Sequence, residues 1–265
     1  MRNKLIKVHW VLSSQFGIDV KHFMQSVAAL PRFFRDRSRF RKQYGGSLST
    51  VPCLHDWYAT AGAAESEYFV QDLLVARWIH EANPRRHVDV GSRIDGLVAH
   101  VASFREIEVF DVRPMSVEIP GVTFKQADLM QPVESAAAPA GGYCDSLSCL
   151  HAIEHFGLGR YGDPIDAQGY ERGIASMARL VAPGGRFYLS TPIGRERVEF
   201  NANRVFDPRT IIRCAEQQEL RLHELTVISA GGAVDRQRQS DESLLRLADA
   251  DYNLGVFVFD KASPT

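Results

Sequence analysis

The stretch His87-Val-Asp-Val-Gly-Ser-Arg-Ile-Asp-Gly96 decides the fold class of this 265-residue chain. Its first four residues predict a strand, and the residues from Asp95 onward predict a helix. Gly91 and Gly96 are spaced like the first and last glycines of a dinucleotide-binding turn, but Arg93 occupies the middle position, where a pyrophosphate needs bare backbone. The stretch therefore predicts an α/β sheet that binds a nucleoside ligand rather than NAD or FAD.

Strand and helix patterns alternate on either side of this stretch, as in a doubly wound sheet. Strands are expected at residues 87–90, 107–111, 122–126, 143–148, 186–190, 221–229 and 255–259. Helices are expected at residues 66–83, 95–103, 167–180 and 207–218, and a loop with one helical turn is expected at 231–249. These patterns predict an α/β fold with a mostly parallel, seven-stranded, Rossmann-like sheet in residues 65–265.

Residues 1–64 are expected to form a basic, helical N-terminal extension. Residues 1–45 contain ten Lys and Arg and two Asp, a net charge of +8, and the remaining residues carry 21 basic and 30 acidic side chains, a net charge of −9. Residues 31–42 interleave Phe with Arg, which is typical of a segment on anionic lipid, nucleic acid or an acidic partner. We expect peripheral contact with an anionic membrane and no nucleic acid; the alternative is a helix that packs its Phe side chains on the main domain.

The composition is that of an ordinary globular protein, with 45% hydrophobic and 24% charged residues. It excludes disordered, collagenous and disulfide-scaffold classes, and no apolar run of about 18 residues predicts a membrane-spanning helix. The N-terminal residues do not have the pattern of a secretory signal. The four cysteines form no CxxC pair, which predicts free thiols and a cytoplasmic location. The oligomeric state stays open.

Acidic residues follow three successive predicted strands. Asp111 ends the second strand about 20 residues after Gly91, where a carboxylate can accept hydrogen bonds from both ribose hydroxyls. After the third strand, Asp128 is placed to accept a hydrogen bond from an adenine amino group, and Leu129 is placed to cover the ring. Each Asp alone is a common turn or cap residue, but three in register favour a nucleoside site.

With these motifs in place, the chain resembles class I S-adenosylmethionine-dependent methyltransferases. The likeness rests on Asp89-x-Gly91, on Asp111, on Asp128-Leu129 and on the run at 143–155, together with the Pro183-Gly-Gly185 turn before the fifth strand. More closely, runs that begin at Tyr68, His87, Ser148 and Glu199 resemble the bacterial family catalogued as domain of unknown function 268, over roughly residues 66–215. That family resembles methyltransferases and tends to accompany surface-polysaccharide biosynthesis.

The resemblance implies S-adenosylmethionine as the cofactor. The implied cofactor-binding residues are Asp89, Gly91, Ser92, Arg93, Asp95, Gly96, Asp111, Asp128, Leu129, Ser148 and Cys149. The chain departs from the superfamily pattern at Arg93 and Asp95, which stand where later glycines are expected. Arg93 either contacts the cofactor's carboxylate or fills the pocket.

The pattern His151-x-x-Glu154-His155 marks a candidate reaction centre. A hydroxyl acceptor needs a base near neutral pH, and His has a suitable pKa; Glu154 would orient a His or hold a divalent ion. The same spacing occurs in inverted zinc proteases, but here the helix would be barely one turn long, and no metal site is expected. A purely structural His/Glu cluster is the alternative.

Polar residues after the fourth and fifth strands are suited to bind a hydroxyl-rich acceptor. They are Arg160, Tyr161, Asp163, Arg195, Glu199, Asn201, Asn203 and Arg204.

These observations lead to the hypothesis of an S-adenosylmethionine-dependent O-methyltransferase that acts on a glycan or sugar intermediate of bacterial surface-polysaccharide biosynthesis, in the cytoplasm or at the inner membrane. Two alternatives remain. One is an inactive methyltransferase-fold binding or scaffold protein of a polysaccharide-assembly complex, and the other is a metal-assisted enzyme that uses His151, Glu154 and His155.

Overall fold

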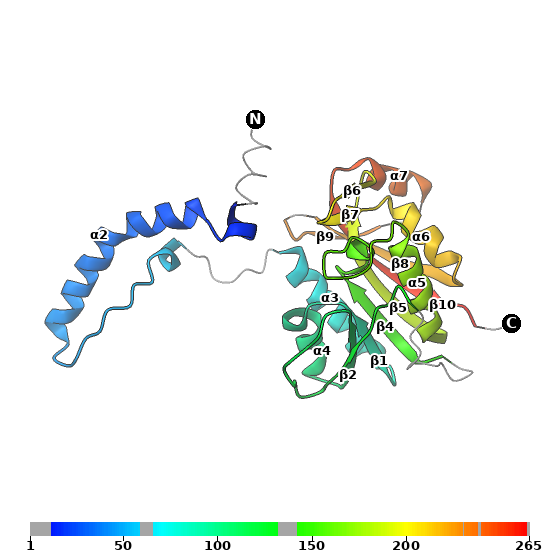
Figure 1. Cartoon of the computed structure of the whole chain (residues 1–265), viewed down its shortest axis with the longest axis horizontal. Coiled ribbons are helices and arrows are strands. Elements are labelled where there is room, and N and C mark those ends of the chain that lie inside the picture. Colours follow the sequence, from blue (N-terminus) through cyan, green and yellow to red (C-terminus); the bar gives the residue numbers. More distant parts are fainter. Residues whose placement is uncertain (1–11, 59–65, 132–141, 230, 238–239, 264–265) are drawn as a thin grey trace. The chain divides into compact units, whose positions relative to one another are not determined.

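The computed structural model describes residues 12–58, 66–131, 142–229, 231–237 and 240–263. The chain divides into two compact units, Met1–Ala63 and Ala64–Thr265, and each is described by itself. In the first unit, helix α2 (Val20–Gln43) is followed by the short helix η1 (His55–Tyr58) (Figure 1). The side chain of Asp19 caps α2 by accepting a hydrogen bond from the backbone N–H of His22.

The second unit is built on an eight-stranded sheet with the strand order β3-β2-β1-β4-β5-β10-β8-β9 (Figure 1). Its strands are β1 (His87–Val90), β2 (Ile107–Asp111), β3 (Val122–Gln126), β4 (Cys144–Leu150), β5 (Val181–Ile193), β8 (Leu220–Ile228), β9 (Val234–Gln237) and β10 (Asn253–Lys261). β1 to β5 pair in parallel, and β10 runs antiparallel between β5 and β8. The carboxyl ends of β1 to β4 therefore meet at one edge of the sheet.

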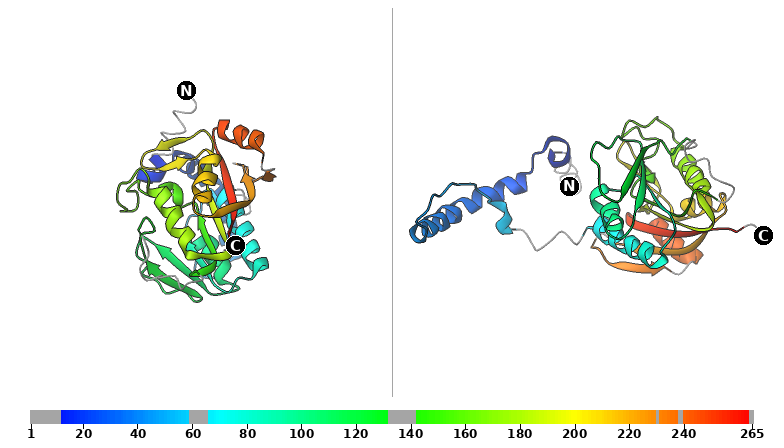
Figure 2. Two further views of the ribbon diagram at one scale, coloured as in Figure 1. Left: turned by 90° about the vertical axis from the view of Figure 1, so that its right-hand side faces the viewer. Right: turned by 90° about the horizontal axis from the view of Figure 1, so that it is seen from below.

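Helices cover both faces of this sheet (Figure 2). One face carries α3 (Glu67–Ala82), the wide turn η2 (Ile94–Val98) and α4 (Ala99–Ala102); the other carries α5 (Gly169–Leu180) and α6 (Pro208–Glu216). The remaining elements are η4 (Ile153–His155), β6 (Arg197–Glu199), β7 (Asn203–Val205) and α7 (Asp241–Asp249). Within the described residues, no helix has the length and apolarity needed to cross a membrane.

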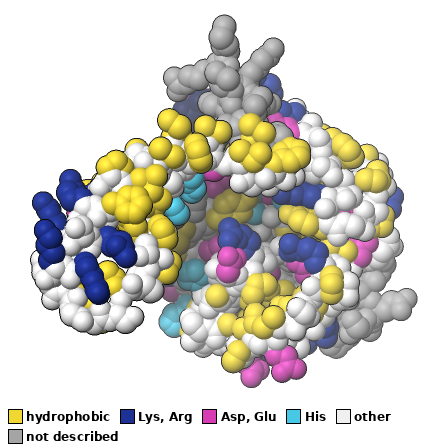
Figure 3. Space-filling view, turned by 60° about the vertical axis from the view of Figure 1, so that its left-hand side comes forward, with side chains coloured by type: hydrophobic (Ala, Val, Ile, Leu, Met, Phe, Trp, Pro, Cys, Tyr) yellow, Lys and Arg dark blue, Asp and Glu magenta, His cyan; other side chains and the backbone are white. Residues whose placement is uncertain are grey.

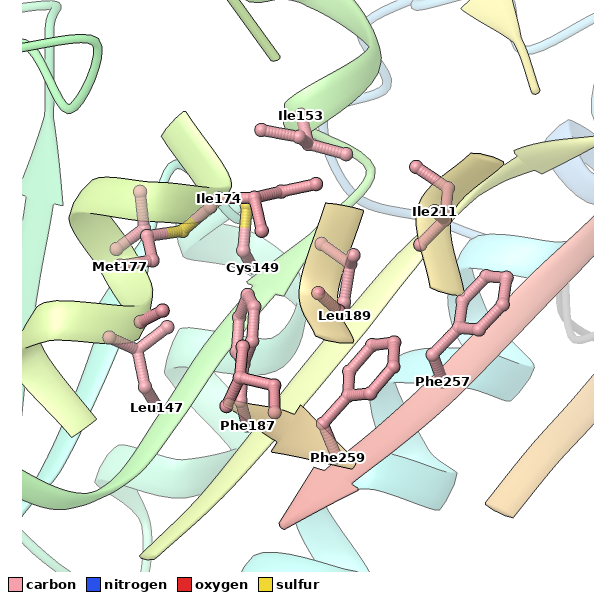
Figure 4. Close-up of a cluster of buried hydrophobic side chains, with 14 of the residues drawn as sticks. Leu147, Cys149, Ile153, Ile174, Met177, Phe187, Leu189, Ile211, Phe257 and Phe259 are labelled. Carbon is pink, nitrogen blue, oxygen red and sulfur yellow. The ribbon is translucent and has the colours of Figure 1, made fainter. Parts of the chain in front are cut away.

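The core follows from the two-residue period of the strands. On β10, Phe257 and Phe259 pack with α5 and α6, while Val256 and Val258 pack with α3 and α4. Figure 4 shows the first of these layers, in which both phenylalanines lie beside Phe187 and Leu189 of β5. Two-sided burial of this kind requires apolar residues on both faces of the central strands.

The structure confirms the expected α/β class and the seven expected strands, with shifts of a few residues at their ends. As expected, Ser66 caps α3, since its side chain accepts a hydrogen bond from the N–H of Phe69. The expectation for residues 231–249 was wrong: this segment contains the antiparallel edge strand β9 and the helix α7 of nine residues. The sheet therefore has eight strands rather than seven.

Candidate functional site

A cavity of about 290 Å³ lies at the edge where the carboxyl ends of β1 to β4 meet. This is the position at which open α/β sheets bind ligands. The residues expected from the sequence that line it are Gly91, Arg93, Asp111, Asp128, Leu129, His151, His155, Arg160, Tyr161 and Asp163. Its other lining residues include Tyr68, Phe110, Arg113, Met130 and Phe156, which sequence reasoning did not assign to the site.

The turn after β1 is held from behind by Asp89. This carboxylate is fully buried and accepts hydrogen bonds from the Ser92 N–H at 3.0 Å, the Ser92 hydroxyl at 2.6 Å and the Ser148 hydroxyl at 2.5 Å. The bonds fix the conformation of Gly91, whose φ of 69° favours glycine. Asp89, Ser92 and Ser148 thus shape the turn, but they do not line the cavity.

Gly96 and Cys149 also lie outside the cavity wall. A Cβ on Gly96 would come within 2.2 Å of the carboxylate of Asp72, so the glycine allows η2 to approach α3 closely. Cys149 is fully buried in the core. Asp95 is exposed and forms an ion pair with the cavity-lining Arg93, with Nη2 and Oδ2 2.7 Å apart.

Asp111 lines the cavity at the end of β2, and Arg113 binds its carboxylate. The Arg113 Nε lies 3.0 Å from Oδ1 and Nη2 lies 2.6 Å from Oδ2, while the Arg113 N–H also donates to Oδ1. The pair is a bidentate guanidinium–carboxylate contact. Three of the roughly four acceptor sites of the Asp111 carboxylate are therefore occupied, and a ribose that binds there must use the remaining site or displace Arg113.

Asp128 and Leu129 follow β3 as expected. The Asp128 carboxylate accepts a hydrogen bond from the N–H of Met130 at 2.9 Å, and Leu129 is buried. Both residues line the cavity beside Phe110. This part of the wall is apolar, with one carboxylate, which suits a flat, hydrogen-bonding ring.

His155 lines the cavity and has a defined tautomer. Its Nδ1 lies 2.7 Å from the carbonyl oxygen of Ala202. Because a carbonyl only accepts, Nδ1 carries the proton, and the lone pair of the neutral ring is on Nε2. Burial lowers the pKa of His155, although the nearby carboxylate of Glu154 opposes this effect. The ring therefore stays neutral at neutral pH.

His151 is more enclosed than His155. Its Nδ1 lies 2.8 Å from Glu154 Oε1, its ring stacks on Tyr68 with 4.2 Å between centroids, and its Nε2 is buried with no hydrogen-bond partner among the described residues. Burial opposes ionisation of Glu154, yet the hydrogen bond and charge of His151 hold its pKa below the usual value. Glu154 is thus an anion that orients His151 through a hydrogen bond, while its Oε1 lies 3.9 Å from His155 Nε2.

The wall continues into a loop at residues 157–163 that Asp163 organises. One oxygen of its carboxylate accepts hydrogen bonds from the N–H groups of Gly157 and Gly159, and the other accepts from Tyr161. The loop presents Arg160, which donates to the Ala202 carbonyl, and Tyr161, whose ring meets His155 edge-on. These side chains surround the histidine from the solvent side.

The remaining expected acceptor residues lie away from the cavity. Arg204 is buried and donates to the backbone carbonyls of Phe156 and Glu154, so it holds the loop rather than a ligand. Arg195 donates to the Asp249 carbonyl, Glu199 pairs with Arg197, and Asn203 donates to the Arg204 carbonyl. Asn201 is exposed.

The donor geometry does not resemble a metal centre. In the part of the chain that the structure describes, no group of three or more His, Cys, Asp or Glu side chains is arranged to hold an ion. As expected, the helix after β4 is too short for the zinc-protease arrangement: η4 has three residues.

Comparisons with known proteins place this geometry in a known fold. The [4+2]-cyclase SpnF is 14% identical over 73% of this chain and 82% of its own, with a TM-score of 0.50. A protein assigned as a sarcosine dimethylglycine methyltransferase from Galdieria sulphuraria is 9% identical over 74% and 85% of the two chains, also with a TM-score of 0.50. The chain has the Rossmann-like fold of class I S-adenosylmethionine-dependent methyltransferases.

A further solved structure is the N-methyltransferase NodS from Bradyrhizobium japonicum in complex with S-adenosylhomocysteine, 15% identical over 77% and 91% of the two chains, with a TM-score of 0.49. The family model described as a Caenorhabditis protein of unknown function, DUF268, matches residues 115–215. That description does not support the expected bacterial origin of the family. No curated protein sequence matches the chain.

Proposed function

We propose that this protein is an S-adenosylmethionine-dependent methyltransferase that acts on a hydroxyl of a sugar or glycan. The observation that carries the proposal is the single cavity that joins Gly91, Asp111 and Asp128 to His155. The first three follow successive parallel strands in the order a nucleoside site requires. The fourth supplies a neutral base in the same cavity.

The lining residues fit the cofactor. Asp111 would hold the ribose hydroxyls once Arg113 releases its carboxylate, Asp128 and Leu129 would hold the adenine, and Arg93 would pair with the amino-acid carboxylate. Gly91 brings its backbone close to Ala152, since a Cβ at this position would lie 3.0 Å from the Ala152 Cβ. When bound, the sulfonium supplies a methyl group that is already activated for displacement.

His155 would take the proton from the acceptor hydroxyl. The Ala202 carbonyl keeps the proton of the neutral ring on Nδ1 and so leaves Nε2 available as the base. Arg160 and Tyr161 would orient the acceptor, since a guanidinium donates hydrogen bonds to hydroxyls and an aromatic ring packs on the apolar face of a sugar. His151 and Glu154, which are hydrogen-bonded to each other, would add a buried charge beside this base.

The activity experiment measures S-adenosylhomocysteine release when the protein is incubated with S-adenosylmethionine and a panel of sugars, sugar phosphates and glycans. We expect turnover with at least one acceptor and a loss of about 10²-fold or more in His155→Gln. The matched control is His80→Gln on the exposed part of α3. Turnover that is unchanged in His155→Gln contradicts the role of this base.

A binding or scaffold protein without transfer activity is a second candidate. The observation in its favour is the ion pair between Arg113 and Asp111, because it leaves the Asp111 carboxylate few acceptor sites for ribose hydroxyls. The fold alone does not decide between the two candidates, because one fold can carry different functions, and a solved structure of this fold is a [4+2]-cyclase. The metal-assisted alternative gains no support from the donor arrangement of His151, Glu154 and His155 in the described residues.

A further inference from the structure

Helix α2 has an exposed apolar face. Val20, Phe23, Met24, Val27 and Phe34 follow one another at helical spacing and therefore share one side of the helix. Their exposed fractions range from 47% for Val27 to 66% for Phe23. Single exposed apolar residues are ordinary, but an apolar stripe over four helical turns is typical of a surface that binds a membrane or another protein.

The opposite face of α2 is covered by its own unit. The chain after the helix returns along it, so that His22 stacks on His55 with 4.8 Å between centroids and the Arg32 guanidinium lies 3.9 Å from the centre of the Trp57 ring. Ala29, which lies between His22 and Arg32 in the sequence, is buried, with 2% of its surface exposed. The internal packing of the unit thus leaves the stripe uncovered and fixes which side of the helix it occupies.

Basic side chains continue and flank the apolar stripe. Past Phe34 the same side of the helix carries Arg41 and Lys42, seven and eight residues further on, and Arg35 and Arg39 lie beside it. Figure 3 shows Lys and Arg side chains gathered at one end of the N-terminal unit and hydrophobic side chains along the rest. The helix combines apolar side chains that can enter hydrocarbon with cations that match anionic headgroups.

We propose that α2 binds the surface of an anionic lipid membrane. The apolar stripe (Val20, Phe23, Met24, Val27 and Phe34) inserts among the acyl chains, and the basic residues at 35–42 lie in the headgroup layer. Interfacial helices have this division into an apolar face and Lys/Arg flanks. The exposed stripe extends the segment expected from the sequence, 31–42, toward the N-terminus. The proposal is independent of methyl transfer, because it concerns a separate unit of the chain.

The experiment is co-sedimentation of the full chain with vesicles of phosphatidylcholine, with and without phosphatidylserine. We expect binding only when phosphatidylserine is present and weakening as salt is added, because salt screens the charge attraction. The double variant Phe23→Ser/Val27→Ser is expected to lose binding while remaining folded, since both side chains are exposed. Val117→Ser, an equally exposed apolar position in the second unit, is the matched control and retains binding.

Charge is tested separately with Arg39→Gln/Lys42→Gln, which is expected to reduce binding to phosphatidylserine vesicles without changing the apolar stripe. Three results overturn the proposal: no binding to anionic vesicles at low salt, equal binding to both vesicle types, or unchanged binding in Phe23→Ser/Val27→Ser. Sedimentation velocity without lipid identifies a competing occupant. A dimer that only Phe23→Ser/Val27→Ser disrupts, without vesicle binding by the parent chain, assigns the stripe to a second copy.

Discussion

At the scale of single residues, Asp111 and Arg113 form an ion pair in the wall of the cavity, where we propose that the ribose binds. The position of Asp111 was predictable because it ends an apolar strand at a fixed distance from Gly91. The pairing was not predictable, because an Arg two residues from an Asp can equally extend into solvent. The structure shows both oxygens of the carboxylate bound to the guanidinium.

Replacing Arg113 by Ala is expected to tighten binding of S-adenosylhomocysteine. The ribose then no longer competes with a guanidinium for Asp111, and a half-exposed ion pair is worth at most about 1 kcal/mol, so the expected gain is up to about fivefold in affinity. Calorimetric titration measures it, with Arg85→Ala, a highly exposed arginine, as the control. Weaker binding in Arg113→Ala means that this side chain helps to hold the ligand.

The two histidines of the motif have different environments, which the spacing alone could not distinguish. Both line the cavity, as do other residues that the sequence placed after the fourth strand. Their difference arises from Ala202, 47 positions away, whose carbonyl oxygen accepts a hydrogen bond from the Nδ1–H of His155. Only the tertiary fold brings that carbonyl to the ring.

The imidazole of His155 is expected to titrate below the ordinary histidine pKa of about 6.5. Burial favours the neutral ring, so its folded pKa is lowered and the ring protonates only as the pH falls further. Two-dimensional NMR of the histidine ring signals measures this pKa between about pH 4 and 8, the range in which histidines titrate. The signal that is missing in His155→Gln is the signal of His155. A midpoint above the ordinary value contradicts the proposed neutral base.

At the scale of elements, the loop at residues 157–163 positions Arg160 and Tyr161 through glycines with positive φ. A Cβ on Gly157, where φ is 77°, would come within 2.0 Å of the Asp166 carbonyl oxygen, whereas Gly162, with a φ of 84°, has no atom within 4 Å. The two positions share the backbone requirement but differ in packing. They therefore separate conformational strain from steric overlap.

Gly157→Ala is expected to destabilise the fold by about 2 to 4 kcal/mol, because strain and overlap add, and Gly162→Ala by about 1 kcal/mol from strain alone. Urea unfolding compares the free energies of unfolding of the two variants, provided that both have the same m value as the parent. Equal losses in the two variants would show that the carbonyl of Asp166 does not constrain the loop.

Prediction of elements from the sequence succeeded where burial imposes a pattern. The central strands carry apolar residues on both faces, and Ser66 caps α3 through a local hydrogen bond, so both features are visible in the sequence. β9 has the sequence Val-Asp-Arg-Gln and is mostly exposed. It pairs with β8 through backbone hydrogen bonds, which leave no pattern of apolar residues in the sequence. The expectation of a loop there was therefore wrong.

At the scale of the whole molecule, two buried carboxyl groups link stability to pH. Burial raises the pKa of Asp72 and of Asp89 from 3.8 to about 6. The folded chain therefore binds more protons at these groups than the unfolded chain does between about pH 4 and 6. Their contribution to the free energy of unfolding is fully present below the pKa of the unfolded chain, 3.8, and is lost as the pH rises through about 6.

Asp72→Asn is expected to be more stable than the parent at pH 7, by up to about 3 kcal/mol, because the amide keeps an acceptor for Gln71 but needs no ionisation. The gain should shrink as the pH falls through about 6 and vanish below about 4. Urea unfolding at several pH values measures it, with the exposed Asp251→Asn as the control. A gain that does not change with pH contradicts the raised pKa of Asp72.

The separation of charge between the two parts of the chain was also visible in the sequence, since it depends only on composition. The sequence did not show which side of α2 is exposed. His55 and Trp57 cover the other side through contacts that form only in the folded unit.

The measurement that tests the central claim most directly is calorimetric titration of the full chain with S-adenosylmethionine and S-adenosylhomocysteine, repeated on Asp111→Asn and on the control Asp251→Asn. The parent and the control are expected to bind with micromolar affinity, about 8 kcal/mol, and Asp111→Asn is expected to bind about tenfold or more weakly. The absence of binding by either compound to the parent chain would contradict the methyltransferase proposal.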